Sequence, residues 1–217
     1  MGLLQFTEHT LEKNLIYFIY FNGKVNHYHL INLSLLKKYW HIFDGKKIVK
    51  IACDGDYSIN ALKHLLPIDC NPIRVQNNKE FGESIHFIES LSHVTDGMTF
   101  YGHCKGVSRP KMRGLEKWIN HLYEANLGQI PSLENKLFSG TCGKLLPCPP
   151  YVPQPFHYSG SFYWFDTVKV KSRITTLEPD KYLTERFPAM IARQNECRFI
   201  APSMAKNLNY YLEETWL

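Results

Sequence analysis

The chain has 217 residues, of which 44% are hydrophobic and 21% are charged. This is the composition of a globular protein that buries a core, and it excludes a disordered chain. Twenty-five Lys and Arg against 20 Asp and Glu give a formal net charge of +5. That mild excess favours an anionic ligand such as a diphosphate, but it falls far short of a nucleic-acid-binding composition. We therefore expect no nucleic-acid partner.

The sequence offers no signal for a membrane or an export route. The longest apolar segment, residues 15–21, has about a third of the length that a membrane span needs. The N-terminus lacks the pattern of a signal peptide, and the six cysteines contain no C-x-x-C pair. Such cysteines are typical of reduced thiols inside cells. We expect no membrane span and a cytoplasmic protein, which can also be one module of a longer chain.

Strands and helices alternate in the first hundred residues. Residues 15–21 (LIYFIYF) are a continuous apolar run, typical of a strand buried on both faces. The predicted strands are 15–21, 47–53, 73–76 and 98–104, and the predicted helices between them are 30–43, 59–66 and about 80–91. Three such crossovers require a parallel sheet with helices on its faces.

After residue 104 this alternation becomes irregular. The apolar spacing predicts a helix over 113–126, and the proline-rich stretch 146–156 predicts an extended loop. A strand over 160–166 and a helix over 182–191, broken by Pro188, complete the chain. No internal repeat is present. We predict one α/β domain over 1–217, with a central, mostly parallel twisted sheet flanked by helices.

Polar residues follow each of the four predicted strands, where an open parallel sheet binds its ligands. They are Tyr20, then Asp54 and Asp56, then Asn77, Asn78 and Lys79, then His103 and Lys105. Neither G-x-G-x-x-G nor the P-loop pattern follows any of these strands. The sequence therefore argues against a dehydrogenase or a kinase.

Three segments in this order, ACDGD, RVQNNKEFGES and TFYGHCKGVS, resemble the nucleotide-binding half of glycosyltransferases with the GT-A fold. The resemblance implies that Asp54 contacts the nucleobase and that Asn77, Asn78 and Gly82 belong to a segment that opens a helix. His103-Cys104-Lys105 stands where the family has a metal-binding Asp-x-Asp, and is similar to the H-x-K pattern of rhamnan-synthesis-type transferases. FYGHCKGVS and HYSGSFYWFD together resemble capsid-glycosylating transferases of large algal (chlorella) viruses.

The departure at His103 and Lys105 changes the expected chemistry of the diphosphate. A leaving diphosphate gains negative charge, which Lys105 could neutralise without a metal. His103 either donates to a phosphate oxygen or binds a metal, and the metal candidates are His103, Asp54 and Asp56, with Mn²⁺ or Mg²⁺ as the ion. Each of these residues also has an interpretation without a ligand. Asp56 would then be a helix N-cap and Asp54 a turn residue, whereas His103 and Lys105 would be a solvated strand end.

A second cluster lies at 157–166, where aromatic and hydroxyl groups suit an acceptor sugar. Ser159 and Gly160 belong to this predicted binding surface, although the same pattern fits an ordinary core strand. The candidates for an acid or base are His157, Asp166 and Glu185. Glu185 is otherwise a solvated helix carboxylate.

The predicted function is a glycosyltransferase that moves a sugar from a nucleotide diphosphate donor, a UDP-sugar, to a glycan or glycoprotein acceptor. The capsid resemblance implies a viral glycan as that acceptor and the host cytoplasm as its location. About 1–108 would bind the nucleotide, and about 109–217 would bind the acceptor. Two alternatives stay open: a sugar nucleotidyltransferase, and a non-catalytic carbohydrate-binding or assembly module.

Overall fold

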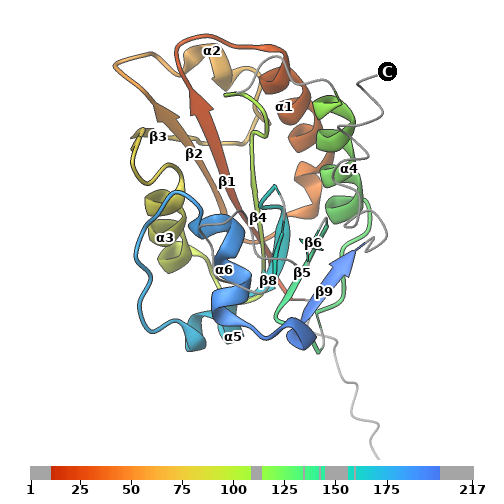
Figure 1. Ribbon diagram of the computed structural model, residues 1–217. Helices are drawn as coiled ribbons and strands as arrows, with labels where there is room; N and C mark the ends of the chain where they lie inside the picture. Colours follow the sequence, from red (N-terminus) through yellow and green to blue (C-terminus); the bar gives the residue numbers. More distant parts are fainter. Residues whose placement is uncertain are drawn as a thin grey trace, which may run out of the picture.

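A computed structural model describes residues 11–108, 114–133, 135–141, 143–144, 156–158 and 160–200. Seven strands form one sheet in the order β3-β2-β1-β4-β8-β5-β9 (Figure 1). Their bounds are β1 Lys13–Phe21, β2 Lys47–Cys53, β3 Ile73–Gln76, β4 Met98–His103, β5 Phe138–Thr141, β8 Tyr163–Asp166 and β9 Cys197–Ile200. A separate pair joins β6 (Gly143–Lys144) to β7 (His157–Tyr158).

The first four strands in sequence are parallel, as the crossovers predict. β8 runs antiparallel to both β4 and β5, and β9 is again parallel to β5. The helices are α1 His27–Tyr39, α2 Asn60–Lys63, α3 Ser84–His93, α4 Leu115–Leu127, α5 Thr167–Arg173 and α6 Leu183–Ile191, with short 3₁₀ turns at Trp40–Ile42 and Gln194–Glu196. The predicted α/β class, with a mostly parallel sheet flanked by helices, is confirmed.

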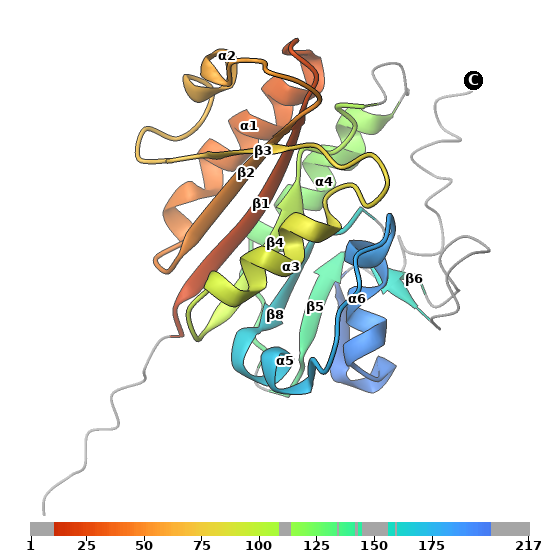
Figure 2. The same ribbon diagram turned by 90° about the vertical axis from the view of Figure 1, so that its left-hand side faces the viewer.

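Each face of the sheet carries its own hydrophobic core. Alternate residues of β1 point to opposite faces: Leu15 and Tyr17 pack with α1 and α4, whereas Ile16 packs with α3 and α6. Figure 2 shows α3 and α6 on the near side of the sheet and α1 and α4 behind it. Burial on both faces explains the continuous apolar run in β1. No helix in the described ranges is long and apolar enough to span a bilayer.

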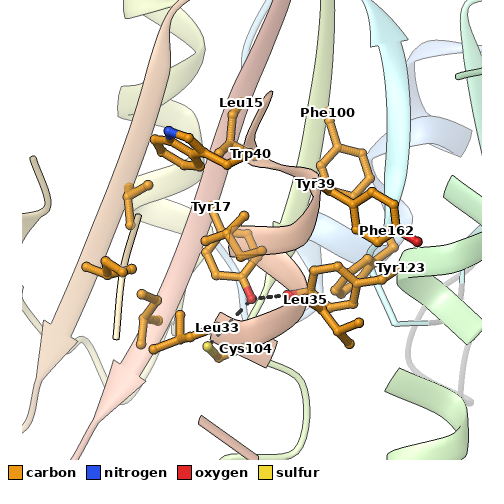
Figure 3. Packing of buried hydrophobic residues seen from close by; sticks show 14 of the residues in the cluster. Leu15, Tyr17, Leu33, Leu35, Tyr39, Trp40, Phe100, Cys104, Tyr123 and Phe162 are labelled. Atoms are coloured by element: carbon orange, nitrogen blue, oxygen red, sulfur yellow. Dashed lines mark hydrogen bonds between the residues drawn. The ribbon is translucent and has the colours of Figure 1, made fainter. Parts of the chain in front are cut away.

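The core between β1, α1 and α4 contains a small polar network among aromatic and aliphatic side chains (Figure 3). The Tyr17 and Tyr123 hydroxyls form a short hydrogen bond, and the Tyr17 hydroxyl also donates to Cys104 Sγ at 3.5 Å. Burial raises the pKa of the Cys104 thiol to about 12, against a weaker opposing effect of the Tyr17 hydrogen bond. This cysteine is therefore a neutral core residue.

Two local predictions are wrong. The first is the break at Pro188, because α6 continues through that residue. Proline has no N–H to donate to the carbonyl of Thr184, four residues earlier. The Tyr163 hydroxyl donates to that carbonyl instead, at 2.9 Å, so the helix loses a backbone bond without leaving a buried acceptor unpaired.

The second correction concerns Asp56, which does not cap the helix after β2. That helix, α2, is short and has Ile59 as its N-cap. The Asp56 carboxylate is fully exposed and approaches Arg74 of β3 at 3.5 Å. A cap at Asp56 would require the helix to begin directly after the turn, whereas residues 57–59 intervene.

Candidate functional site

The carboxyl ends of β1 to β4 meet at one edge of the sheet, where β1 lies between β2 and β4. This is the switch point at which open parallel sheets bind ligands. A cleft of about 570 Å³ opens there, within the range of small-molecule sites, roughly 300–1,000 Å³. Its lining includes Tyr20, Asp54, Asn77, Asn78, Lys79, His103 and Lys105. Seven of the eight residues that the sequence singles out after these strands therefore face one cavity, and the exception is Asp56.

Asp54 is held from both sides at the edge of this cleft. The Tyr20 hydroxyl donates to Asp54 Oδ2, and Asn77 Nδ2 donates to Asp54 Oδ1 at 2.7 Å. These two hydrogen bonds, Tyr20 first, hold the pKa of Asp54 below its ordinary value. The same interaction with Asp54 raises the pKa of Tyr20 to about 12. The site therefore presents an ionised, oriented carboxylate that can still accept a further donor.

The literal D-x-D of the sequence does not form a metal pair. Asp54 lines the cleft, whereas the Asp56 side chain turns toward Arg74 and is not part of the lining. Over the described ranges, no three His, Cys, Asp or Glu side chains come together as a metal-binding group. The described residues thus form no cage of three protein ligands for Mn²⁺ or Mg²⁺.

The loop that carries Lys105 is anchored by a buried asparagine of α1. The Asn32 amide accepts from the Lys105 backbone N–H at 3.1 Å and donates to the Lys105 carbonyl at 3.0 Å. Asn26, the N-cap of α1, donates to the carbonyl of Val107 at 2.8 Å. Gly106 has a φ of +83°, and a Cβ there would lie 2.3 Å from Leu115. Helix α1 therefore fixes the backbone path of this loop.

Lys105 reaches across the cleft to α4. Its ammonium lies 4.7 Å from the ring centroid of Trp118, and both residues line the cavity. A cation over an indole face keeps its charge while its position is restrained. Lys79 and Lys181 also line the cleft, so three ammonium groups surround the space.

A half-buried carboxylate that the sequence did not single out lies beside His103 in the cleft lining. Glu83 Oε1 accepts from the Thr184 hydroxyl at 2.7 Å and lies 3.0 Å from His103 Nδ1. Burial raises the pKa of Glu83, but the charge and hydrogen bond of His103 and the Thr184 hydrogen bond outweigh it and lower the pKa to about 2. Glu83 lies inside the helix predicted over about 80–91, whereas α3 begins one residue later, at Ser84. Its place just after Gly82, near the carboxyl end of β3, was the available signal.

The candidates for the acceptor half are scattered. Glu185 lines the cleft, together with Ser161 and Thr184. Asp166 pairs with Met98, the first residue of β4, and so lies at the opposite end of the sheet. There it caps α5 by accepting from the Lys169 backbone N–H at 3.0 Å. This position separates Asp166 from the cleft residues.

Two further acceptor candidates, His157 and Gly160, are not part of the cleft lining. His157 is buried in β7, in register with Lys144 of β6. Gly160 has a φ of +89° and packs beside Trp118 and Leu122, where a Cβ would lie 3.3 Å and 3.1 Å from them. Ser159 lies outside the described residues. Of the predicted acid or base residues, only Glu185 shares the cavity with the predicted donor-binding residues.

The comparisons with known proteins add distant likenesses in fold. No family model matches the sequence, and no curated protein matches it. The solved structures that match include the 4-diphosphocytidyl-2C-methyl-D-erythritol synthase of Anaerococcus prevotii, at 11% identity and a TM-score of 0.45, over 87% of this chain and 86% of that one. A mannosyltransferase of Pyrobaculum calidifontis, in complex with GDP-Man and Mn²⁺, matches at 12% identity and a TM-score of 0.42, over 90% of this chain and 55% of that one. Likenesses this distant assign neither an activity nor a substrate to this chain.

Proposed function

We propose that this chain is a glycosyltransferase that moves a sugar from a nucleotide diphosphate donor, a UDP-sugar, to a hydroxyl of a glycan or glycoprotein. The observation that carries the proposal is the single cleft at the switch point of the sheet, lined by the polar residues that follow all four parallel strands. A non-catalytic carbohydrate-binding module does not need this convergence. That a viral capsid glycan is the acceptor rests on the sequence resemblance alone.

The nucleoside is assigned to the β1–β3 side of the cleft. There Asp54 offers a fixed carboxylate, which suits an N–H donor on the base or a hydroxyl of the ribose. Asn77 and Asn78 supply further amide groups on the same side. The diphosphate is assigned to the β4 side, where Lys105 supplies charge to the oxygen that leaves the sugar. Residues 1–108 would thus bind most of the donor.

The acceptor is assigned to the side of the cleft formed by Ser161 and α6. Ser161 and Thr184 bear hydroxyls, and Tyr182 and Trp118 offer the aromatic faces that sugar rings pack against. These residues come from the second half of the chain, consistent with an acceptor half over about 109–217. Glu185 remains a candidate for contact with an acceptor hydroxyl.

Nucleotide binding tests this proposal directly. A ligand at 100 times its Kd stabilises the folded state by about 2.7 kcal/mol, which raises the Tm of a chain of this length by roughly 5 to 10 °C. We expect UDP to give this shift and ADP and GDP to give less. Stabilisation by ADP or GDP in preference to UDP contradicts the uridine assignment, and stabilisation by no nucleotide favours the carbohydrate-binding module.

A sugar nucleotidyltransferase is the second enzyme class to exclude, because it too binds a nucleotide at such an edge. It joins a nucleoside triphosphate to a sugar 1-phosphate and releases pyrophosphate. Incubation with UTP and sugar 1-phosphates, followed by a pyrophosphate assay, separates the two. We expect no pyrophosphate from this protein, and UDP release from UDP-sugars in the presence of an acceptor.

A further inference from the structure

The contact between His103 and Glu83 determines which nitrogen of the imidazole carries the proton. An ionised carboxylate only accepts hydrogen bonds, so the contact of 3.0 Å between Glu83 Oε1 and His103 Nδ1 requires the proton on Nδ1. In the neutral ring, Nε2 is then the proton acceptor. Thr184 donates to the same carboxylate oxygen and fixes it from the α6 side.

The imidazole has little freedom to turn. His103 is the last residue of β4, its side chain is 14% exposed, and that of Glu83 is 17% exposed. The Phe162 and His103 rings are nearly perpendicular, with centroids 5.8 Å apart and an angle of 84° between their planes. His103 nevertheless lines the cleft. The carboxylate and the phenyl ring therefore hold the imidazole in one orientation beside the ligand space.

We propose that His103, oriented by Glu83, is the general base that takes the proton from the acceptor hydroxyl. This role rests on the proposed glycosyl transfer. The acceptor oxygen forms a bond to the anomeric carbon, while the bond from that carbon to the diphosphate oxygen breaks and its electron pair leaves with UDP. The acceptor proton moves to His103 Nε2 and later to solvent. A direct displacement of this kind inverts the anomeric configuration.

Charge explains why His103 is better suited to take the acceptor's proton than to bind a phosphate of the donor. When His103 takes a proton, its charge is balanced by Glu83, so the pair is neutral and attracts a diphosphate only weakly. Lys105, two residues further on, places its ammonium 4.7 Å from the centroid of the Trp118 ring in the same cleft and is the group assigned to the diphosphate. The charged groups that share the cleft with His103 are Asp54, Lys79, Glu83, Lys105, Lys181 and Glu185.

Two variants and a matched control test the role. Glu83→Gln keeps the shape of the side chain but removes the charge that stabilises the imidazolium, and His103→Gln removes the base. We expect each to lower turnover by about a hundredfold or more, in line with the usual contribution of a general base, with UDP affinity unchanged within about threefold. Glu80→Gln is the control, since Glu80 is exposed in the same loop and is not part of the cleft lining. It should behave as the wild type.

Nitrogen NMR of the imidazole supplies a readout that needs no activity. In the wild type we expect the proton on Nδ1 of His103. In Glu83→Gln we expect this tautomer to be no longer fixed, because a neutral amide can donate to Nδ1 as well as accept from it. A proton on Nε2 at neutral pH overturns the base assignment, as does a His103→Gln variant whose losses lie wholly in UDP affinity. If the tautomer is as expected but the wild type neither binds UDP nor transfers sugar, the proposed function fails and the pair is structural.

Discussion

Replacement of Asn32 by alanine tests how much the Asn32 side chain contributes to holding the loop that carries Lys105. Asn32 is fully buried in α1, and its amide satisfies both the N–H and the C=O of Lys105. Its bond to the Tyr28 carbonyl at 2.7 Å lies within the helix, where the backbone already pairs that carbonyl. It also accepts from the Tyr123 hydroxyl at 3.4 Å, but that hydroxyl keeps its hydrogen bond to Tyr17 when Asn32 is replaced. The loss that matters is therefore confined to the two backbone groups of Lys105.

The size of the effect follows from those two groups. Leaving a buried donor or acceptor unpaired costs about 1 to 3 kcal/mol. Lys105 is half-buried, so water compensates in part, and we expect the free energy of unfolding to fall by about 2 to 3 kcal/mol. Asn120→Ala is the matched control, because Asn120 makes the same kind of bond to a carbonyl four residues earlier, that of Glu116, but holds no loop. Both substitutions gain the same helix propensity, so this contribution cancels in their difference, which reports the anchor together with the loss of a fully buried side chain at Asn32.

Urea unfolding followed by circular dichroism measures the free energy of unfolding of both variants. The two values are compared at an equal slope of free energy against urea concentration. We expect Asn120→Ala to stay within about 0.5 kcal/mol of the wild type. The folded Asn32→Ala protein should also bind UDP more weakly, since the backbone that positions Lys105 is released. Equal stabilities for the two variants would refute the reasoning, because they would mean that the Lys105 backbone does not depend on Asn32.

Three further outcomes are expected. Lys105→Ala should lower turnover by roughly a hundred to a thousandfold and donor affinity by less, and Lys105→Arg should recover part of the rate; steady-state kinetics with and without Mn²⁺ check this. Asp54→Ala should weaken UDP binding in calorimetry much more than Asp56→Ala, and equal losses would point to a shared metal. Because the pKa of Glu83 is lowered from 4.5 to about 2, its ionised form stabilises the fold fully above pH 4.5 and loses this effect toward pH 2. Wild type should therefore lose more stability than Glu83→Gln over that range in acid unfolding.

The first half of the fold could be predicted from the sequence because its signals are local. A strand buried on both faces reads as a continuous apolar run, as in β1. The predicted bounds of 47–53 and 73–76 are those of β2 and of the exposed edge strand β3. Parallel strands also share one carboxyl edge, so the residues that follow them converge on one cleft. The cluster from Tyr20 to Lys105 could therefore be named before the structure was described.

Long-range contacts decided the rest. The helix containing Pro188 continues because a hydroxyl from β8 replaces the missing donor, a partner 25 positions away that no local pattern contains. β8 enters the sheet antiparallel to β4, which carries Asp166 to the end opposite the cleft. Glu83 meets His103 across 20 residues, and Thr184 reaches the same oxygen across 101. A single sequence records which side chains exist, but distances between residues remote in the chain are set only when the sheet and helices pack.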